Sequence, residues 1–387
     1  MENPALQPLW VDSQAGVAQV CERAAAVGAA AVDTEADSFH SYFHKLCLIQ
    51  LTVAGEHAVL DPLALGRRGL QPLVAMLGDR NVEKVFHGAD YDLRVLHRDL
   101  GARVVRLRDT QVAAQLLGEP QTGLAAMLGK ELGIELDKQF QRADWGVRPL
   151  APELLAYAAA DTAGLEALRT RVATRLEALG RLGWWEEECE ALESVEWEAP
   201  QPDPNAFERL KGARRLKGEA RDRLAALFVW REGAAAEQDV PPFRVLQAEA
   251  MLSLAGNPPD SLAVLAALPG IARGTVRRLG GEILRVLAEA PPAPPAAGRK
   301  HREVDRERER RVRVLRDVRD AIAKELGLEP GVLAPKATLE LIVEHQPSDL
   351  PALRGCLGRR WRAEVLAERL LPTVAGFSAR GAGAVTD

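Results

Sequence analysis

The stretch AAAVDTE at residues 29–35 is the strongest signal in the sequence, because it joins a predicted buried strand to a pair of acids. Its apolar start predicts a strand over residues 29–34. Alternate residues of a strand share a face, so Asp33 and Glu35 would project their carboxylates together. Like charges that are buried side by side are unfavourable without a cation. The motif therefore predicts a site for Mg²⁺ or Mn²⁺, which prefer oxygen ligands, unless the strand simply ends at Asp33 and the acids face water.

The sequence that follows this strand alternates between predicted strands and predicted helices as far as about residue 180. Ala54 and Gly55 are expected to join two of the strands as a hairpin, and Pro152 suits the first turn of a long helix. Early hairpin strands followed by strand–helix units predict an α/β domain with a mixed sheet flanked by helices. The further strands are expected at 46–53, 56–61, 82–87 and 104–107, and the helices at 91–100, 110–117, 124–132 and 152–179.

A second acidic motif is VFHGADYDL at residues 85–93. A predicted strand ends at Gly88, and a predicted helix starts at the acids. Aspartate is a preferred residue at the start of a helix, and this capping role suits Asp90. Asp92 would lie on the first turn of the helix, where it is free to point into a cleft.

A third motif is YAAAD at residues 157–161. Tyr157 and Asp161 are four residues apart, so they lie on one face of a helix. Alone, this pair also fits a half-buried tyrosine beside a surface acid. The three motifs together supply four carboxylates on separate elements, with a phenol beside the last. Such a set predicts a site for two metal ions, which at a separation of about 3.5–4 Å can activate a water and stabilise the leaving oxygen in phosphodiester cleavage.

The composition fits a globular chain of two or three domains, and the charge differs between its halves. The chain has 387 residues, against roughly 100–200 for one domain. Residues 1–200 hold 19 Lys and Arg against 30 Asp and Glu, while residues 201–387 hold 31 against 25. An acidic first half suits divalent cations, and a more basic second half suits phosphates. An ordinary solvated surface is the alternative, and charge alone does not decide between them.

Several classes of site and location are disfavoured. The four cysteines are far apart and form no CxxC pair, so neither a zinc site nor a disulfide framework is indicated. No apolar run reaches the roughly 18 residues of a membrane span. The first twenty residues lack the basic start of a signal peptide. We therefore expect a cytoplasmic protein without membrane contact, and we infer no obligatory protein partner.

The three motifs, taken in order, resemble those of a known nuclease superfamily. Asp-Thr-Glu, His-Gly-Ala-Asp-x-Asp and Tyr-x-x-x-Asp are similar to the exonuclease motifs of the DEDD superfamily, in its tyrosine branch, and the overall layout is similar to that of the bacterial ribonuclease D family. The resemblance implies a ribonuclease H-like fold and a 3′–5′ exonuclease that uses two divalent metal ions. It makes Asp33, Glu35, Asp92 and Asp161 the catalytic, metal-binding carboxylates. Tyr157 would orient the attacking water, because its usual pKa near 10 is too high for a base at neutral pH.

A basic segment, KQFQRADW at residues 138–145, resembles the stretch that lies near the active-site cleft in ribonuclease D. Lys138 and Arg142 could contact phosphate, and Gln141 is a further candidate for contact with substrate. The two aromatic residues of this segment could stack on a base, although such residues more often belong to a core. His87 could approach the terminal nucleotide, or could simply form a hydrogen bond at the end of its strand.

Two proline-rich linkers divide the second half of the chain into helical segments. The first segment resembles an HRDC domain, the helicase-and-ribonuclease-D C-terminal module, in its helix at 220–231 and its turn at 240–242. A more diverged copy follows, with a matching turn at 328–336. We therefore expect an exonuclease domain followed by two all-α HRDC-type domains, with boundaries at 1–198, 206–290 and 300–377.

Two basic clusters in the first helical segment suit a phosphate backbone, although each also fits a solvated helical face. Two such modules behind one nuclease would grip a structured substrate at two points and raise its affinity without reading its sequence. The clusters are Lys211, Arg214, Arg215 and Lys217, and Arg273, Arg277 and Arg278.

Three functions remain in competition. By resemblance, the leading hypothesis is an exoribonuclease that removes nucleotides one at a time from RNA 3′ ends, with precursor transfer RNA as substrate. A DNA exonuclease in repair would use the same carboxylates, because contacts to the 2′-hydroxyl are invisible in a sequence. The third hypothesis is a noncatalytic nucleic-acid-binding protein on a dead nuclease fold. The intact set of four acids argues against it, since binding alone has no use for buried acids.

Overall fold

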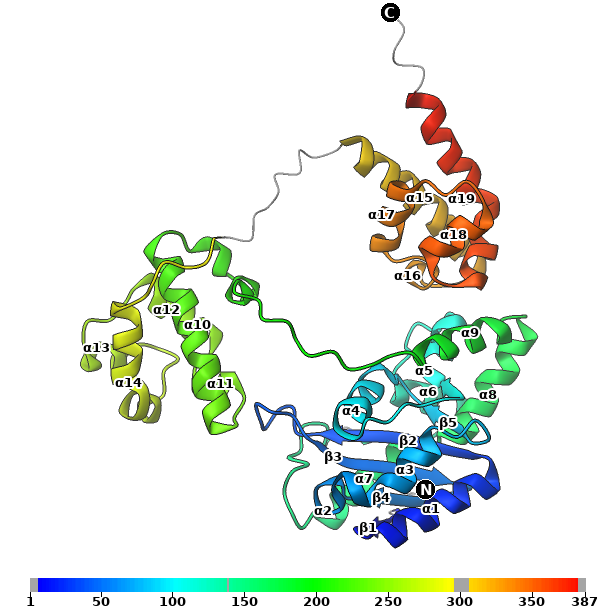
Figure 1. Cartoon of the computed structure of the whole chain (residues 1–387), viewed down its shortest axis with the longest axis horizontal. Helices are drawn as coiled ribbons and strands as arrows, with labels where there is room; N and C mark the ends of the chain where they lie inside the picture. Colours follow the sequence, from blue (N-terminus) through cyan, green and yellow to red (C-terminus); the bar gives the residue numbers. More distant parts are fainter. Residues whose placement is uncertain (1–5, 138, 296–305, 382–387) are drawn as a thin grey trace, which may run out of the picture. The chain divides into compact units, whose positions relative to one another are not determined.

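The computed structural model describes residues 6–137, 139–295 and 306–381, with side chains up to Phe377 (Figure 1). These residues belong to two compact units. The first comprises Met1–Glu35, Leu46–Glu198 and Val304–Asp387, and the second comprises Ala36–Lys45 and Ala199–Glu303. None of the helices in the described ranges has the length and apolar character that crossing a bilayer requires.

A mixed six-stranded sheet forms the centre of the first unit, in the order β1-β4-β3-β2-β5-β6. β3 and β4 are antiparallel, whereas β1 runs parallel to β4, and β5 runs parallel to both β2 and β6. The predicted mixed sheet is confirmed, and the strand that carries Asp33 and Glu35 is an inner strand. The strands are β1 (Leu9–Val11), β2 (Ala29–Ala36), β3 (Leu46–Val53), β4 (Glu56–Leu60), β5 (Glu83–Phe86) and β6 (Leu107–Asp109).

One predicted turn of this sheet is confirmed, and one predicted strand is wrong. The hairpin between β3 and β4 is confirmed, and Ala54 and Gly55 have φ values of 49° and 80°, the positive values that a tight two-residue turn requires. The predicted strand at 104–107 is wrong, because β6 begins only at Leu107. Arg106 has a φ of 53°, a left-handed conformation that interrupts an extended run.

Helices pack on both faces of the sheet. The predicted single helix over 152–179 is wrong, because the chain breaks at Gly164 into two helices. A Cβ at Gly164 would lie 2.7 Å from Leu128 Cδ2, so the missing side chain lets the turn pack closely against α6. The helices of this part are α1 (Gln14–Val27), α2 (Pro62–Gly69), α3 (Gln71–Leu77), α4 (Asp90–Leu100), α5 (Thr110–Leu116), α6 (Leu124–Leu132), α7 (Pro152–Ala163), α8 (Leu165–Ala178) and α9 (Leu182–Leu192).

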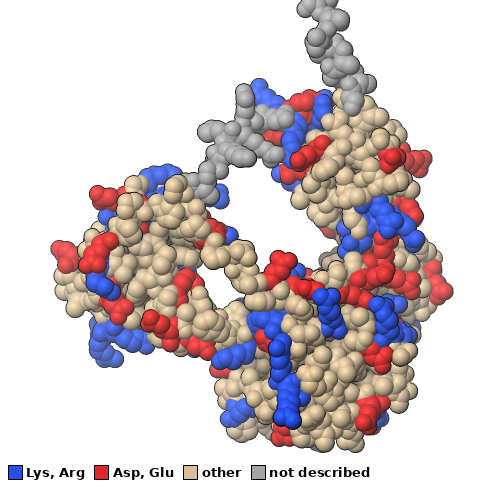
Figure 2. Space-filling view, in the orientation of Figure 1, with Lys and Arg blue, Asp and Glu red and all other residues tan. Residues whose placement is uncertain are grey.

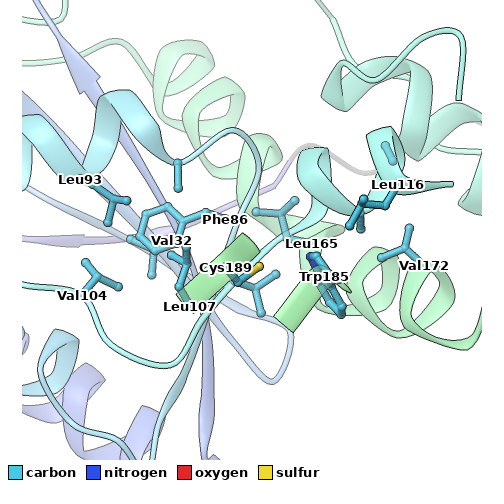
Figure 3. Close-up of a cluster of buried hydrophobic side chains, with 14 of the residues drawn as sticks. Val32, Phe86, Leu93, Val104, Leu107, Leu116, Leu165, Val172, Trp185 and Cys189 are labelled. Atoms are coloured by element: carbon cyan, nitrogen blue, oxygen red, sulfur yellow. The ribbon is translucent and has the colours of Figure 1, made fainter. Parts of the chain in front are cut away.

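The largest hydrophobic core joins the sheet to helices α4 and α9 (Figure 3). Val32, Phe86 and Leu107 come from three adjacent strands, and their apolar side chains are buried there. Trp185 of α9 is buried with them, and its Nε1 donates a hydrogen bond to the carbonyl oxygen of Asp109 at 2.7 Å. This contact fixes α9 to the end of β6.

The C-terminal helices belong to the first unit because they continue its hydrophobic core. Leu353 and Leu366 are fully buried within the cluster that also contains the core of the sheet. α9 and α19 are in direct contact. These helices are α15 (Arg306–Leu326), α16 (Pro330–Leu333), α17 (Lys336–His345), α18 (Leu350–Leu357) and α19 (Arg360–Gly381).

The second unit has a hydrophobic core of its own. Leu227, Met251 and Ile283 are fully buried at its centre, and Tyr42 packs against this core from the loop that follows β2. The loop at 36–45 therefore belongs to the same compact unit as the middle helices. The helices are α10 (Glu219–Gln238), α11 (Pro242–Val245), α12 (Ala248–Gly256), α13 (Leu262–Ala267) and α14 (Arg273–Ala288), preceded by the short turns η1 (Ala206–Arg209) and η2 (Ala213–Arg215).

Candidate metal centre

Three of the predicted acids meet between β2 and α7. Asp33 and Glu35 come from β2, where alternate residues share a face, and Asp161 comes from α7. One ligand oxygen from each of the three carboxylates lies within 4.8 Å of those of the other two. Oxygen ligands at this spacing suit a hard divalent cation such as Mg²⁺ or Mn²⁺.

Asp92, the fourth predicted acid, lies beside this group, although its oxygens are not part of the 4.8 Å set. It is on the first turn of α4, and its side chain is buried. Thr34, which lies between the two acids of β2, donates a hydrogen bond from Oγ1 to Asp92 Oδ1. Burial is the largest cause of the raised pKa of Asp33 and of Glu35, and the charge of Asp92 adds to both shifts. All four acids are therefore neighbours, with three of them in reach of one ion.

The position of Asp92 depends on Asp109, a buried acid at the end of β6. Asp109 accepts hydrogen bonds from the backbone N–H groups of Gly88 and Ala89, at 2.9 and 2.8 Å, which hold the turn that leads into α4. It also accepts from Gln111 N at 2.8 Å and so caps α5. Sequence reasoning missed this residue, although an aspartate directly before a predicted helix is a recognisable capping signal.

The electrostatics of the group favour a bound cation. Burial, followed by the charges of Asp92, Asp161 and Glu35, raises the pKa of Asp33 well above its usual range. Burial, followed by the charges of Asp161 and Asp92, raises the pKa of Glu35 to about 8. Burial also raises the pKa of Asp92 to about 7 and that of Asp161 to about 6. Carboxylates that are held together against their own repulsion fit a divalent metal ion, whose charge reverses the local field.

Tyr157 lies one helical turn before Asp161 in a cluster of rings. Its ring packs edge-on against Phe140, with centroids 5.6 Å apart, and stacks on Trp145 at 6.1 Å. Burial, followed by the charges of Asp161 and Glu35, raises the pKa of the phenol. The group therefore stays protonated at neutral pH, where it can donate a hydrogen bond but cannot serve as a base.

An ion pair that sequence reasoning missed holds this ring cluster against the sheet. Nε and Nη2 of Arg148 donate to the two carboxylate oxygens of Asp61, at 2.9 and 2.8 Å. The same guanidinium donates to the carbonyl oxygens of Cys47 and Trp145, at 2.9 and 2.8 Å. Arg148 thus ties the segment that carries Trp145 to β3 and to the end of β4. Asp61 and Arg148 are 87 residues apart, so no local pattern could reveal the pair.

The predicted substrate-binding residues are not gathered at one place by any described contact. His87 Nδ1 lies 2.9 Å from Thr110 Oγ1, which in turn donates to the carbonyl oxygen of Phe86. This geometry is that of a histidine bonded at the end of its strand, and a contact with substrate stays a prediction. Gln141 and Arg142 are exposed, as such a contact requires. Lys138 lies outside the described residues.

Two family models match the chain. The model described as 3′-5′ exonuclease matches residues 8–177, and the HRDC domain model matches residues 220–287 and 308–374. The chain is 32% identical to "Ribonuclease D" of Gluconacetobacter diazotrophicus over 94% of this chain and 92% of that protein. It is 30% identical to "Ribonuclease D" of Acidiphilium cryptum, over 97% and 96% of the two chains.

Solved structures agree with this assignment. The structure of Escherichia coli RNase D, described as an exoribonuclease involved in structured RNA processing, matches with a TM-score of 0.68 and 26% identity over 96% of this chain and 99% of that one. The catalytic core of RRP6 from Trypanosoma brucei matches with a TM-score of 0.67 and 30% identity over 74% and 81% of the chains.

Proposed function

The chain belongs to the ribonuclease D family of 3′–5′ exoribonucleases, and from this premise we propose that two divalent metal ions perform its reaction at the acids between β2 and α7. The observation that supports this proposal is the 4.8 Å grouping of ligand oxygens from Asp33, Glu35 and Asp161. Asp92 is their neighbour and would hold the second ion. When bound, Mg²⁺ or Mn²⁺ supplies positive charge that activates a water and stabilises the leaving oxygen.

In this proposal the side chains around the acids position the reactants. Tyr157, held by its ring contacts with Phe140 and Trp145, donates its hydroxyl proton in a hydrogen bond that orients the attacking water. Thr34 and Asp109 fix Asp92 from two sides, through its carboxylate and through the turn before its helix. Buried partners hold these side chains in place before substrate binds. The side chains then need no reordering at each turnover, which favours a fast reaction.

We propose structured RNA, such as precursor transfer RNA, as the substrate. The support is the described role of the E. coli relative in structured RNA processing. We assign catalysis to residues 1–198 and RNA grip to the HRDC-type domains at 206–290 and 300–377. Lys and Arg side chains are interspersed with Asp and Glu on the surface seen in Figure 2 and do not form one continuous stripe there.

The test of this function uses the full chain and two 5′-labelled oligonucleotides of one sequence, one of RNA and one of DNA, with Mg²⁺, with Mn²⁺ or with a chelator. We expect the RNA to shorten one nucleotide at a time from its 3′ end, and the chelator to abolish the reaction. DNA that shortens as fast as RNA would favour the alternative of a DNA exonuclease. Binding of RNA without shortening in either metal would favour the noncatalytic alternative.

A further inference from the structure

The exposed phenylalanines of the described chain lie on two adjoining segments of the second unit. Phe39 and Phe43 follow β2 and are 51% and 58% exposed, and Phe243 of α11 is 52% exposed. The other phenylalanines whose side chains are described are buried or half-buried. Single apolar side chains on a surface need no explanation, but large rings gathered on one surface mark a place of interaction.

Hydrogen bonds bring the two segments together. The backbone N–H of Phe43 donates to Asp239 Oδ1 at 2.9 Å, and Lys45 Nζ donates to Asp239 Oδ2 at 2.9 Å. At the other end of the contact, Arg244 Nη2 donates to His40 Nδ1 at 3.1 Å. The loop at 36–45 therefore lies along the chain from Asp239 to Arg244. We call Phe39, Phe43, Phe243 and Arg244 the aromatic platform.

The loop that carries two of these rings is held rigidly. Asp37 is buried and accepts hydrogen bonds from the backbone N–H of Lys45, at 2.6 Å, and from the hydroxyl of Ser41. Tyr42 packs against the hydrophobic core of the unit and meets Phe43 edge-on, with ring centroids 5.0 Å apart. Anchoring one ring fixes its neighbour in an exposed position. A surface that is ordered before binding loses little entropy when a ligand arrives.

α11 presents the third ring in a similar way. Val245 is buried in the core of the unit and anchors this short helix. Phe243 and Arg244, the two residues before it, are both exposed. The platform thus consists of rings and a guanidinium that two anchored segments hold in place.

Arg244 gives the aromatic platform a positive charge. A guanidinium can only donate hydrogen bonds, so His40 Nδ1 must accept, and this nitrogen carries no proton. This hydrogen bond brings no negative charge to Arg244. Lys45 differs, because its ammonium group is paired with Asp239. Exposed rings beside an exposed arginine match the chemistry of single-stranded nucleic acid, which offers flat bases for stacking and phosphates for ion pairing.

We propose that the aromatic platform binds an unpaired stretch of the RNA substrate, with bases stacked on Phe43 and Phe243 and a phosphate paired with Arg244. This proposal rests on the proposed function, because it takes RNA as the ligand. Stacking accepts every base, so the platform recognises single-strandedness and not sequence. It would give the enzyme a preference for substrates that carry an unpaired tail next to their structured part.

The experiment measures the affinity of the full chain for a fluorescent, unstructured 12-nucleotide RNA in the presence of a chelator, so that no cleavage occurs. Replacing both rings, with Phe43→Leu and Phe243→Leu, should weaken binding at least tenfold, since stacking contributes about 1–3 kcal/mol per base. Phe43→Trp should retain the wild-type affinity. Arg244→Gln should also weaken binding, and the slope of log affinity against log salt should fall by about 0.7. Val229→Ala, at a 70% exposed residue of α10 outside the platform, is the matched control.

Each result has one interpretation, provided that the melting temperatures of the variants match the wild type. Loss of affinity in the leucine variant with retention in the tryptophan variant supports the platform. Equal affinity of the leucine variant and the wild type overturns it, as does an equal loss in the control at Val229. Failure of the proposed function would be seen separately, because the wild-type chain would then not shorten RNA when metal is restored.

Discussion

Trp184 of α9 stacks on Trp361 of α19, with ring centroids 4.6 Å apart and ring planes 16° apart. Beneath this stack, Glu188 is buried and accepts hydrogen bonds from Trp361 Nε1 at 2.8 Å and from Arg359 Nε at 3.1 Å, and it pairs with Arg362 at 2.8 Å. The last HRDC-type domain is thus tied to the catalytic region by rings and by charge. We infer that it forms part of the folded body of the nuclease.

We therefore expect Glu188→Ala to destabilise the protein by about 3 kcal/mol, because it leaves the half-buried guanidinium of Arg362 without the carboxylate of Glu188. The measurement is equilibrium unfolding in urea, monitored by tryptophan fluorescence. Glu190→Ala, at an exposed acid of the same helix, should change stability by less than about 0.5 kcal/mol. Equal effects of the two substitutions would show that the contact with α19 contributes nothing.

Asp92 and Asp90 provide a matched pair on the first turn of α4. Asp92 is buried beside the other acids, whereas Asp90 is exposed and pairs with Arg94 at 2.9 Å. Asp92→Asn should lower the rate of RNA shortening by at least about a hundredfold, because the residue that we propose as a ligand of the second metal ion loses its charge. Asp90→Asn should leave the rate within about twofold, since an exposed ion pair contributes little. Rates under single-turnover conditions test this, and similar losses in both variants would count against the site.

Tyr157→Phe removes the hydroxyl and keeps the ring, so it tests the role of the hydroxyl alone. The phenyl ring retains the packing against Phe140 and Trp145, so we expect the melting temperature to stay the same. Loss of the hydrogen bond that we propose to orient the water should lower kcat by about tenfold to a hundredfold, the equivalent of about 1.4–2.7 kcal/mol. KM should change little. Unchanged kcat in this variant would remove Tyr157 from the mechanism.

The stability of the metal-free protein should fall as pH rises from about 4 to 8. Burial raises the folded-state pKa to about 8 for Glu35, where the charges of Asp161 and Asp92 add to it, to about 7 for Asp92 and to about 6 for Asp161, whereas carboxylates in an unfolded chain titrate near pH 4. The folded form thus binds these protons more tightly than the unfolded form does, and their loss favours unfolding. Mn²⁺ should reverse the effect, and its stabilisation should grow over the same range. Melting curves with chelator and with Mn²⁺ measure both trends, and a stabilisation by Mn²⁺ that does not depend on pH would contradict them.

The sequence predicted most of the sheet and the shared face of the two acids of β2 because both depend on local patterns. Alternation along β2 placed Asp33 and Glu35 on one face, and the four-residue spacing in α7 placed Asp161 one turn after Tyr157. The pattern failed where backbone conformation overrode it, as at Arg106, whose positive φ delays β6. It also failed at Gly164, where the chain turns between two helices.

Contacts between distant residues had no such signal. Arg148 and Asp61 are 87 residues apart, and Trp361 and Glu188 are 173 residues apart, so nothing in either segment alone reveals the partner. The same holds for the loop at 36–45, which follows the strand of the acids but packs with the middle helices. These partners become visible only when the tertiary structure brings them together.

We propose that the acids between β2 and α7 bind divalent metal, and the decisive measurement is the binding of Mn²⁺ to the metal-free full chain. Calorimetric titration at pH 8 should detect Mn²⁺ binding to the wild-type chain. Asp33→Asn should weaken that binding at least about a hundredfold, because the group of acids loses one of its charged ligands. Wild-type affinity for Mn²⁺ in this variant would contradict the account.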